Sequence, residues 1–232
     1  YSANADFKDS TVKKLTANKP DTLTISGLTA GNKYYVRVRS YTNVGENVYY
    51  GAWSDSKNIT TAKYDITKSA ISGIFTKTYT GKNITQSVKV KYNGKTLKSG
   101  TDYTVSYSSN KKVGTATVKI TGKGQYGGTV SKTFKINPAK QKIQKLTAKS
   151  KAFFIDWAQK GSATGYEVQY ATNSKFTGAK KLDVANNKTD KMTISKLSAN
   201  KKYYVKVRSY TLVKGTKYYG EWSAVKSVTT KK

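Results

Sequence analysis

The chain contains two copies of one sequence, and this internal duplication limits the folds that it can adopt. Residues 1–61 align without a gap to residues 170–230, at a constant offset of 169 positions. The stretch TISGLTAGNKYYVRVRSYT, which begins at Thr24, corresponds to TISKLSANKKYYVKVRSYT, which begins at Thr193. About half of the aligned positions are identical. Agreement over this length indicates a duplicated structural unit, so the two copies must share a fold.

The second copy has the residue pattern of β-strands. In the stretch YYVKVRSY, the apolar residues Tyr203, Val205 and Val207 alternate with Lys206 and Arg208. Successive side chains of a strand point to opposite faces of the sheet. The pattern therefore predicts a strand with one face in a core and the other in solvent.

The second copy continues upstream of its match, whereas the first copy does not. Three runs rich in aromatic and β-branched residues precede or enter it, at residues 145–147, 152–157 and 166–170. We therefore expect residues 1–63 to form an N-terminally incomplete module, whose sheet exposes an apolar face or an unpaired edge.

The segment between the copies shows the same strand pattern. Alternating runs lie at residues 88–92, 103–107, 115–120 and 130–136, and glycines separate them as in turns. Pro138 favours a junction after the last run, because proline cannot extend a central strand. We predict an all-β chain of tandem antiparallel β-sandwich modules with little or no helix. The expected modules are the first module, residues 1–63; the middle module, residues 64–138; and the third module, residues 139–232.

The third module resembles a fibronectin type III domain. Trp157 lies where that family buries a tryptophan on its second strand, and the run YEVQY resembles the third strand. Leu197 precedes Tyr203 by six positions, as in the tyrosine corner of the family, and the first copy repeats this pair at Leu28 and Tyr34. The first module is thus similar to an incomplete domain of the same type.

Two further resemblances concern the setting of the chain. The stretch KKYYVKVRSYTLVKGTKYYGEWSAVKSV is similar to the variant found in surface or cell-wall proteins of Gram-positive, Clostridia-type bacteria. The middle module, with TYTGKNI at Thr78 and LKSGTDYTVSYSSNKKVGTATVKITGKGQYGGTVSKTFKI from Leu97, resembles bacterial immunoglobulin-like repeats. These resemblances imply an extracellular, cell-surface or cell-wall location, with the modules of the same protein as neighbours. They do not imply a function, because such modules serve as spacers, stalks and binding units alike.

The composition removes most catalytic chemistry. The chain has no cysteine and no histidine, which excludes thiol catalysis, disulfides, the usual general base and the commonest metal ligand. Of its 12 acidic residues, Asp102 fits a turn, while Asp156 and Glu167 alternate with core residues and should face solvent beside lysines. No acid lies in a core run, as a Lys–Asn isopeptide crosslink would require. We therefore expect no enzyme, no metal site and no cofactor.

Clustered aromatic residues are the best candidate for a binding site. Each copy has two tyrosines and a tryptophan near the end of a hairpin, where they could stack on sugars or bases. These residues are Tyr49, Tyr50, Trp53, Tyr218, Tyr219 and Trp222. The favoured alternative is structural: each tryptophan packs between two basic side chains on the outward face of the preceding strand, as in cytokine-receptor domains of this family. The basic residues of this cation–π stack are Arg37 and Arg39 in the first copy, and Lys206 and Arg208 in the second.

The charge of the chain also has two interpretations. The chain has 43 basic residues and a net charge of +31, and 40 of the basic residues are lysines without a dense tract. Specific nucleic-acid recognition favours arginine, so we expect none. A diffuse lysine field attracts polyanions such as anionic wall polymers or acidic host glycans. Equally, lysines on exposed strands prevent sheets from pairing edge to edge.

These observations leave two hypotheses about function. The first is a non-catalytic segment of a bacterial surface or secreted protein, acting as a stalk, spacer or adhesion module with weak binding to anionic polymers. The alternative is an accessory, substrate-targeting or wall-targeting region of a secreted hydrolase whose catalytic domain lies outside this chain. We expect no membrane insertion, since no run approaches the ~20 apolar residues of a spanning helix.

Overall fold

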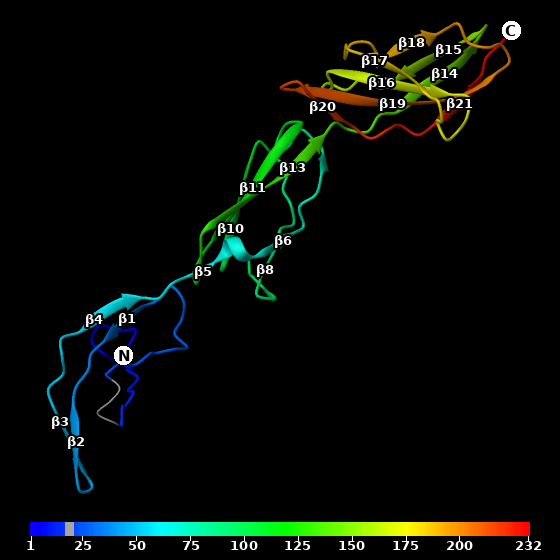
Figure 1. Cartoon of the computed structure of the whole chain (residues 1–232). Helices are drawn as coiled ribbons and strands as arrows, with labels where there is room; N and C mark the ends of the chain where they lie inside the picture. The colour runs from blue at the N-terminus through cyan, green and yellow to red at the C-terminus, as the bar shows by residue number, and fades with distance from the viewer. Residues whose placement is uncertain (17–20) are drawn as a thin grey trace. The chain divides into compact units, whose positions relative to one another are not determined.

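A computed structural model describes residues 1–16 and 21–232 of the chain (Figure 1). The chain forms two compact units. One contains Tyr1–Ser72, Lys89–Val105 and Lys119–Val130, and the other contains Gly73–Val88, Ser106–Val118 and Ser131–Lys232. Three strands of the middle module run through both units, so the division into three modules stays a prediction.

The regular secondary structure of the described residues is almost entirely β, as the alternation predicts. The one helical element among them is a single 3-10 turn, η1 (Ile66–Lys68), which Asp65 caps by accepting a hydrogen bond from the Thr67 N–H at 2.9 Å. In the part of the chain that the structure describes, no helix is long and apolar enough to cross a membrane.

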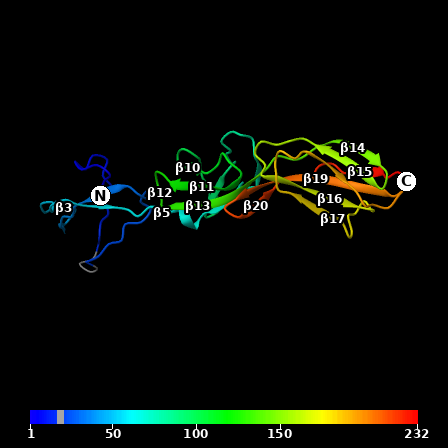
Figure 2. The same ribbon diagram turned by 90° about the horizontal axis from the view of Figure 1, so that it is seen from above.

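The third module is a sandwich of two sheets. One sheet has the strand order β14-β15-β18, and the other has the order β17-β16-β19-β20, with β21 also paired to β19. Figures 1 and 2 show the two sheets as separate layers. The strands are β14 (Ile143–Lys149), β15 (Ala152–Trp157), β16 (Gly165–Ala171), β17 (Lys180–Val184), β18 (Lys191–Ile194), β19 (Lys202–Val213), β20 (Thr216–Tyr219) and β21 (Lys226–Thr229).

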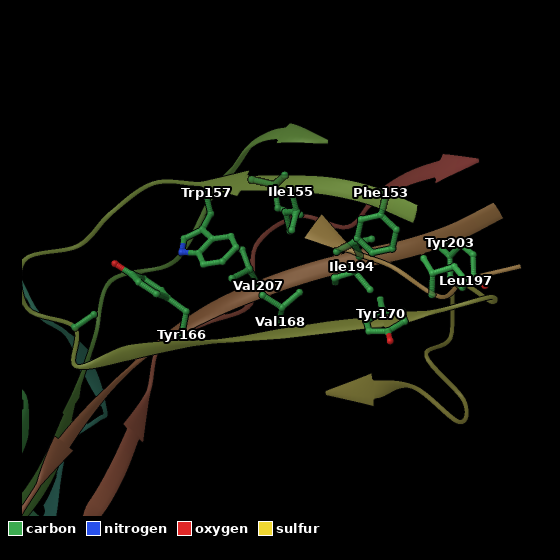
Figure 3. Packing of buried hydrophobic residues seen from close by; sticks show 13 residues of the cluster. Phe153, Ile155, Trp157, Tyr166, Val168, Tyr170, Ile194, Leu197, Tyr203 and Val207 are labelled. Atoms are coloured by element: carbon green, nitrogen blue, oxygen red, sulfur yellow. The ribbon is translucent and has the colours of Figure 1, made fainter. Parts of the chain in front are cut away.

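Alternate residues of β15, β16 and β19 fill the core between these sheets (Figure 3). The indole of Trp157 is fully buried and meets the ring of Tyr166 edge to face, with 5.5 Å between ring centroids. The Tyr166 hydroxyl accepts a hydrogen bond from the Lys160 N–H at 2.9 Å, and burial raises the pKa of this phenol. Hydrophobic residues at every second position thus form the core that the sequence predicts.

The tyrosine corner closes the loop that precedes β19. The Tyr203 hydroxyl accepts a hydrogen bond from the Ser198 N–H at 3.2 Å. In the first module, the hydroxyl of Tyr34 accepts the equivalent bond from the Thr29 N–H at 3.0 Å. Hydrogen bonding to Thr29, first through its side chain and then through its backbone, lowers the pKa of Tyr34, because it stabilises the phenolate. The duplicated sequence therefore produces a duplicated local structure.

The two ends of the third module are tied together. Ser150, directly after β14, and Lys231, just after β21, form a parallel bridge. The Lys151 N–H donates to the Lys231 carbonyl at 3.0 Å, and the Lys231 N–H donates to the Lys149 carbonyl at 2.9 Å. The first and last strands of the module therefore run in the same direction where they meet.

The middle module has nine strands, and the predicted runs coincide with β8, β10, β11 and β13. Its sheets have the orders β10-β11-β13-β7, β6-β8-β9 and β12-β5. The pairs β13·β7 and β12·β5 are parallel, a departure from the expected antiparallel pairing. The strands are β5 (Tyr64–Asp65), β6 (Ala70–Ser72), β7 (Lys77–Thr78), β8 (Lys89–Tyr92), β9 (Lys95–Thr96), β10 (Tyr103–Ser108), β11 (Gly114–Gly122), β12 (Tyr126–Gly127) and β13 (Thr129–Asn137).

Two turns of the middle module follow from local sequence. Asn93 and Gly94 both have positive φ, 45° and 80°, and join β8 to β9 as an Asn-Gly hairpin turn. The Asp102 carboxylate accepts a hydrogen bond from the Lys98 N–H at 2.8 Å. This carboxylate therefore has the turn-stabilising role that the sequence favours.

The first module has far less paired structure than the third. Its described residues form two sheets of two strands each, β1 with β4 and β2 with β3. Its buried positions include Ala30 and Tyr34, while Val38 is 68% exposed and Ile59 is 62% exposed. The described part of the module therefore exposes apolar side chains, and its division from the rest of the chain stays a prediction. The strands are β1 (Lys33–Val36), β2 (Tyr41–Val44), β3 (Asn47–Tyr50) and β4 (Lys57–Thr60).

Candidate functional site

Trp222 of the third module lies against two basic side chains of β19. The Nζ atom of Lys206 is 4.7 Å from the centroid of the Trp222 ring, and the Cζ atom of Arg208 is 4.4 Å from it. Two further rings continue the stack. The centroid of the Phe176 ring lies 4.1 Å from Lys206 Nζ, and the centroid of the Tyr219 ring lies 3.8 Å from Arg208 Cζ. Aromatic and cationic groups thus alternate along the face of the strand.

The first module contains the same stack. Arg37 Cζ is 4.5 Å and Arg39 Cζ is 4.3 Å from the centroid of the Trp53 ring. The centroid of the Phe7 ring lies 4.0 Å from Arg37 Cζ, and the centroid of the Tyr50 ring lies 3.8 Å from Arg39 Cζ. Each member lies 169 positions before its counterpart.

The residue after each tryptophan fixes the ring over the strand. The Ser223 N–H donates to the Val207 carbonyl at 2.8 Å, and the Val207 N–H donates to Ser223 Oγ at 3.1 Å. Ser54 and Val38 make the same two bonds, at 2.8 and 3.1 Å. Because each valine lies between the two basic residues of its stack, the bonds place the preceding tryptophan across both cations.

The two stacks differ in how their arginines are neutralised. In the third module, Nη2 of Arg208 donates to both carboxylate oxygens of Glu167, at 3.1 and 3.2 Å. Among the described residues, Arg37 and Arg39 have no carboxylate within ion-pair distance. Glu167 was expected to face solvent beside lysines, and this expectation is wrong. Its side chain is mostly buried, because its register on β16 places it opposite Arg208.

Two cations lie close together in the stack of the third module, and their proximity affects the pKa of Lys206. Burial and the neighbouring Arg208 guanidinium lower the pKa of Lys206, although Glu167 partly opposes the shift. A lysine flanked by two aromatic rings loses hydration, which disfavours its charged form. The cations of this stack are therefore held by aromatic rings and by one carboxylate.

The predicted ligand-binding residues do not gather on one face. Tyr50 and Tyr219 belong to the stacks, together with Trp53 and Trp222. Tyr49 and Tyr218 are the preceding residues on the same strands, so strand alternation directs them to the opposite face. In each copy, the two tyrosines and the tryptophan therefore do not form a single stacking surface.

Sequence reasoning missed two members of the stacks, Phe7 and Phe176. Both have positive φ, 61° and 58°, and both lie in loops without a strand pattern. The only sequence signal for them is that phenylalanine stands at both positions of the duplicated alignment.

The acidic residues form no visible metal centre. Within residues 1–16 and 21–232, no group of three or more acidic side chains is arranged to hold a metal ion. Asp156 is half-buried on β15, where its register neighbours are Lys145 on β14 and Lys191 on β18. This position beside two lysines is the one expected from the sequence.

Replacing Trp222 by alanine should lower the free energy of unfolding of the third module by about 1 to 3 kcal/mol. The variant loses a partly buried ring and its contacts with both cations. Trp222→Phe, which keeps a ring between the cations, should retain most of the stability. Denaturant unfolding measures the difference, and an unchanged midpoint in Trp222→Ala would show that the stack is not structural.

A comparison with protein families agrees with the architecture of the third module. The family model described as the fibronectin type III domain matches residues 138–229. A comparison of the sequence with curated proteins gives no match.

Solved structures with similar coordinates include two that are named for FN domains. The FN1–FN3 domains of chicken CNTN1 are 14% identical, with a TM-score of 0.36, over 88% of this chain and 79% of that one. The FN5 domain of Drosophila Lar is 21% identical, with a TM-score of 0.32, over 41% of this chain and 98% of that one. A beta-1,2-glucanase from Parabacteroides distasonis is 18% identical, with a TM-score of 0.35, over 50% of this chain and 18% of that one.

The matched residues coincide with the two-layered sandwich of β14 to β21 and with its buried Trp157 and tyrosine corner. Residues 138–229 therefore match in sequence the fibronectin type III domain, a type of module that is generally non-catalytic, and they have a two-layered β architecture.

Proposed function

We propose that the chain is a non-catalytic segment of a bacterial surface or secreted protein, which acts as a spacer and makes adhesive contacts with anionic polymers. The observation that carries the proposal is the uncompensated positive charge on a framework of β modules. The partners are anionic wall polymers or acidic host glycans, bound through charge rather than through a shaped pocket.

Few of the basic residues are neutralised within the protein. The chain has 43 basic and 12 acidic residues, and the described residues form three ion pairs. The pairs are Lys140 with Glu221, Arg208 with Glu167, and Lys217 with Asp183. Most lysines in the described part of the chain therefore have no ion-pair partner.

The outward face of the β14-β15-β18 sheet shows how this charge is presented. Lys145, Lys149 and Lys191 are exposed on this face, and Asp156 is the acidic residue that lies between two of them in register. Such a face attracts a polyanion over several contacts but offers no directional recognition of one group.

The arginines of the first module add a second type of contact. Arg37 and Arg39 are half-exposed, are held in place by aromatic rings, and have no carboxylate partner among the described residues. Ordered guanidinium groups can bind sulfate, phosphate or carboxylate through paired hydrogen bonds.

Binding to heparin and to a DNA duplex should be detectable at about 50 mM salt and fall steeply by about 200 mM. For about five contacted anions, counterion release predicts a loss on the order of 10²- to 10³-fold over this range. Titrations followed by fluorescence anisotropy at several salt concentrations give the slope. No binding at low salt would contradict the proposal, as would tight binding to a neutral glycan that survives high salt.

Variants of one face test whether the contacts are distributed. The slope in question is that of the logarithm of the binding constant against the logarithm of the salt concentration. Changing Lys145, Lys149 and Lys191 together to glutamine should lower the magnitude of this slope by about 2 to 3, whereas each single change should have a small effect. The matched control changes the same residues to arginine and should keep the slope.

A further inference from the structure

An open cleft with a basic lining lies within the compact unit that contains residues 106–118 and 131–232. Its volume of about 730 Å³ is in the usual range of sites for small ligands. One wall is formed by residues 109–115, which precede and begin β11. The other wall is formed by four positions between 213 and 218, in the hairpin of β19 and β20. The cleft therefore lies apart from the cation–π stacks.

Turns and backbone hydrogen bonds hold both walls in place. The Asn110 carbonyl accepts a hydrogen bond from the Ile84 N–H at 2.8 Å, and the Asn110 side-chain amide donates to the Ile84 carbonyl at 2.8 Å. Lys214 and Gly215 have positive φ, 47° and 80°, and form the two-residue turn between β19 and β20. Walls that are ordered in advance lower the entropic cost of holding a ligand.

Tyr218 lines this cleft, although it takes no part in the stack around Trp222. Strand alternation directs its side chain away from the face that Tyr219 shares with the stack. The hydroxyl oxygen of Tyr218 lies 2.8 Å from Oγ1 of Thr115, so one hydrogen bond joins the two walls. The tyrosine that the sequence assigned to a binding site thus contributes to a different surface from the tryptophan.

The charged residues of the lining all have the same sign. Lys111, Lys112 and Lys214 line the cleft, and its lining in the described part of the chain contains no aspartate or glutamate. These lysines are exposed, and none of them takes part in the three ion pairs of the described residues. An ammonium group attracts an anion without requiring the paired geometry of a guanidinium. The cleft is therefore suited to an anionic ligand.

The uncharged residues of the lining narrow the ligand further. Ser109, Thr115, Thr216 and Tyr218 bring hydroxyl groups to the cleft, and Asn110 brings an amide. A hydroxyl group both donates and accepts hydrogen bonds, as the hydroxyl groups of a sugar do. A ligand that matches the whole lining therefore carries acidic groups and hydroxyl groups together.

We propose that the cleft lined by residues 109–115 and by Val213, Lys214, Thr216 and Tyr218 binds a short acidic oligosaccharide. The lysines hold its carboxylate or sulfate groups, and the hydroxyl groups of the cleft bond to those of the sugar. The inference rests on the proposed function for the anionic class of the partner. It goes further because distributed lysines attract a polymer at many places, whereas the cleft holds one short segment.

The test measures binding of a fluorescein-labelled heparin tetrasaccharide to the full chain by anisotropy, in about 150 mM salt. At this salt concentration charges more than about 8 Å apart are largely screened, so a short probe reports local contacts. Changing Lys111, Lys112 and Lys214 together to glutamine should weaken binding by about 10-fold or more. The matched control changes Lys145, Lys149 and Lys191 to glutamine. It removes the same charge from another surface and should weaken binding by less than about 2-fold.

A second variant tests the hydroxyl groups without a change of charge. Tyr218→Phe should weaken binding of the tetrasaccharide by about 3-fold, because it removes one hydrogen-bonding group from the cleft. Tyr49→Phe is the control, since Tyr49 is the counterpart of Tyr218 in the first copy and does not line the cleft. This control should leave the affinity unchanged.

The outcomes separate this inference from the proposed function. Equal losses of tetrasaccharide binding in the two triple-lysine variants would overturn the cleft, while salt-sensitive binding of long heparin would still support distributed contacts. Absence of binding by both the tetrasaccharide and long heparin at low salt would overturn both. A glycerol phosphate oligomer that binds more tightly than the tetrasaccharide, with no effect of Tyr218→Phe, would overturn the assignment of a saccharide ligand.

Discussion

Trp157→Ala is expected to lower the free energy of unfolding of the third module by about 3 to 5 kcal/mol. The indole is fully buried between the sheets, and its removal leaves a cavity lined by side chains of β15, β16 and β19 that cannot fully collapse. A domain of this size has about 5 to 15 kcal/mol of stability, so the loss takes a large share of it.

Hydrogen exchange in peptides of β15, β16 and β19 measures this loss for the third module alone. Val225→Ala is the control, because Val225 is 47% exposed and its truncation should change stability by less than about 0.5 kcal/mol. A cost below about 1 kcal/mol for Trp157→Ala would mean that the core is not closed around the indole.

Gly73→Ala is expected to cost about 3 kcal/mol or more. Gly73 has a φ of 81°, which disfavours any residue with a Cβ, and that Cβ would overlap the carbonyl oxygen of Ser87. A backbone oxygen cannot move away as a flexible side chain can, so strain adds to the cost of the φ angle.

Gly94→Ala separates the cost of the positive φ angle from the cost of the overlap with the Ser87 carbonyl oxygen. Gly94 has nearly the same φ, 80°, but a Cβ there would meet nothing within 4 Å. Its substitution should cost only about 1 kcal/mol. Equal losses for the two variants, measured by chemical denaturation, would show that the overlap with Ser87 is relieved without cost.

The sequence predicts the strands and the core of the third module well, because both follow from local periodicity. Trp157, Val205 and Val207 occupy alternate positions, and alternation alone assigns them to a buried face. Duplication adds a second, independent signal, since Tyr34 and Tyr203 recur at the same offset and both accept a loop hydrogen bond.

Contacts between distant strands are less accessible from sequence. Glu167 and Arg208 pair because β16 and β19 lie in one register, which no local pattern specifies. The parallel pairing of Tyr64 with Tyr126 likewise joins residues far apart in the chain. Phe7 reaches its stack from a loop. In a loop, side chains do not alternate regularly between two faces, so the sequence does not predict where Phe7 points.

The parallel bridge between Ser150 and Lys231 has a mechanical consequence. The chain enters the third module ahead of β14 and leaves it after β21, so tension along the polypeptide pulls these strands in opposite directions. Because the strands run in the same direction where they meet, the force acts along their axes and loads the bonds of Lys149, Lys151 and Lys231 together. A module loaded in shear fails at a rate set by its unfolding barrier rather than by its equilibrium stability. Such a geometry suits a domain that bears load.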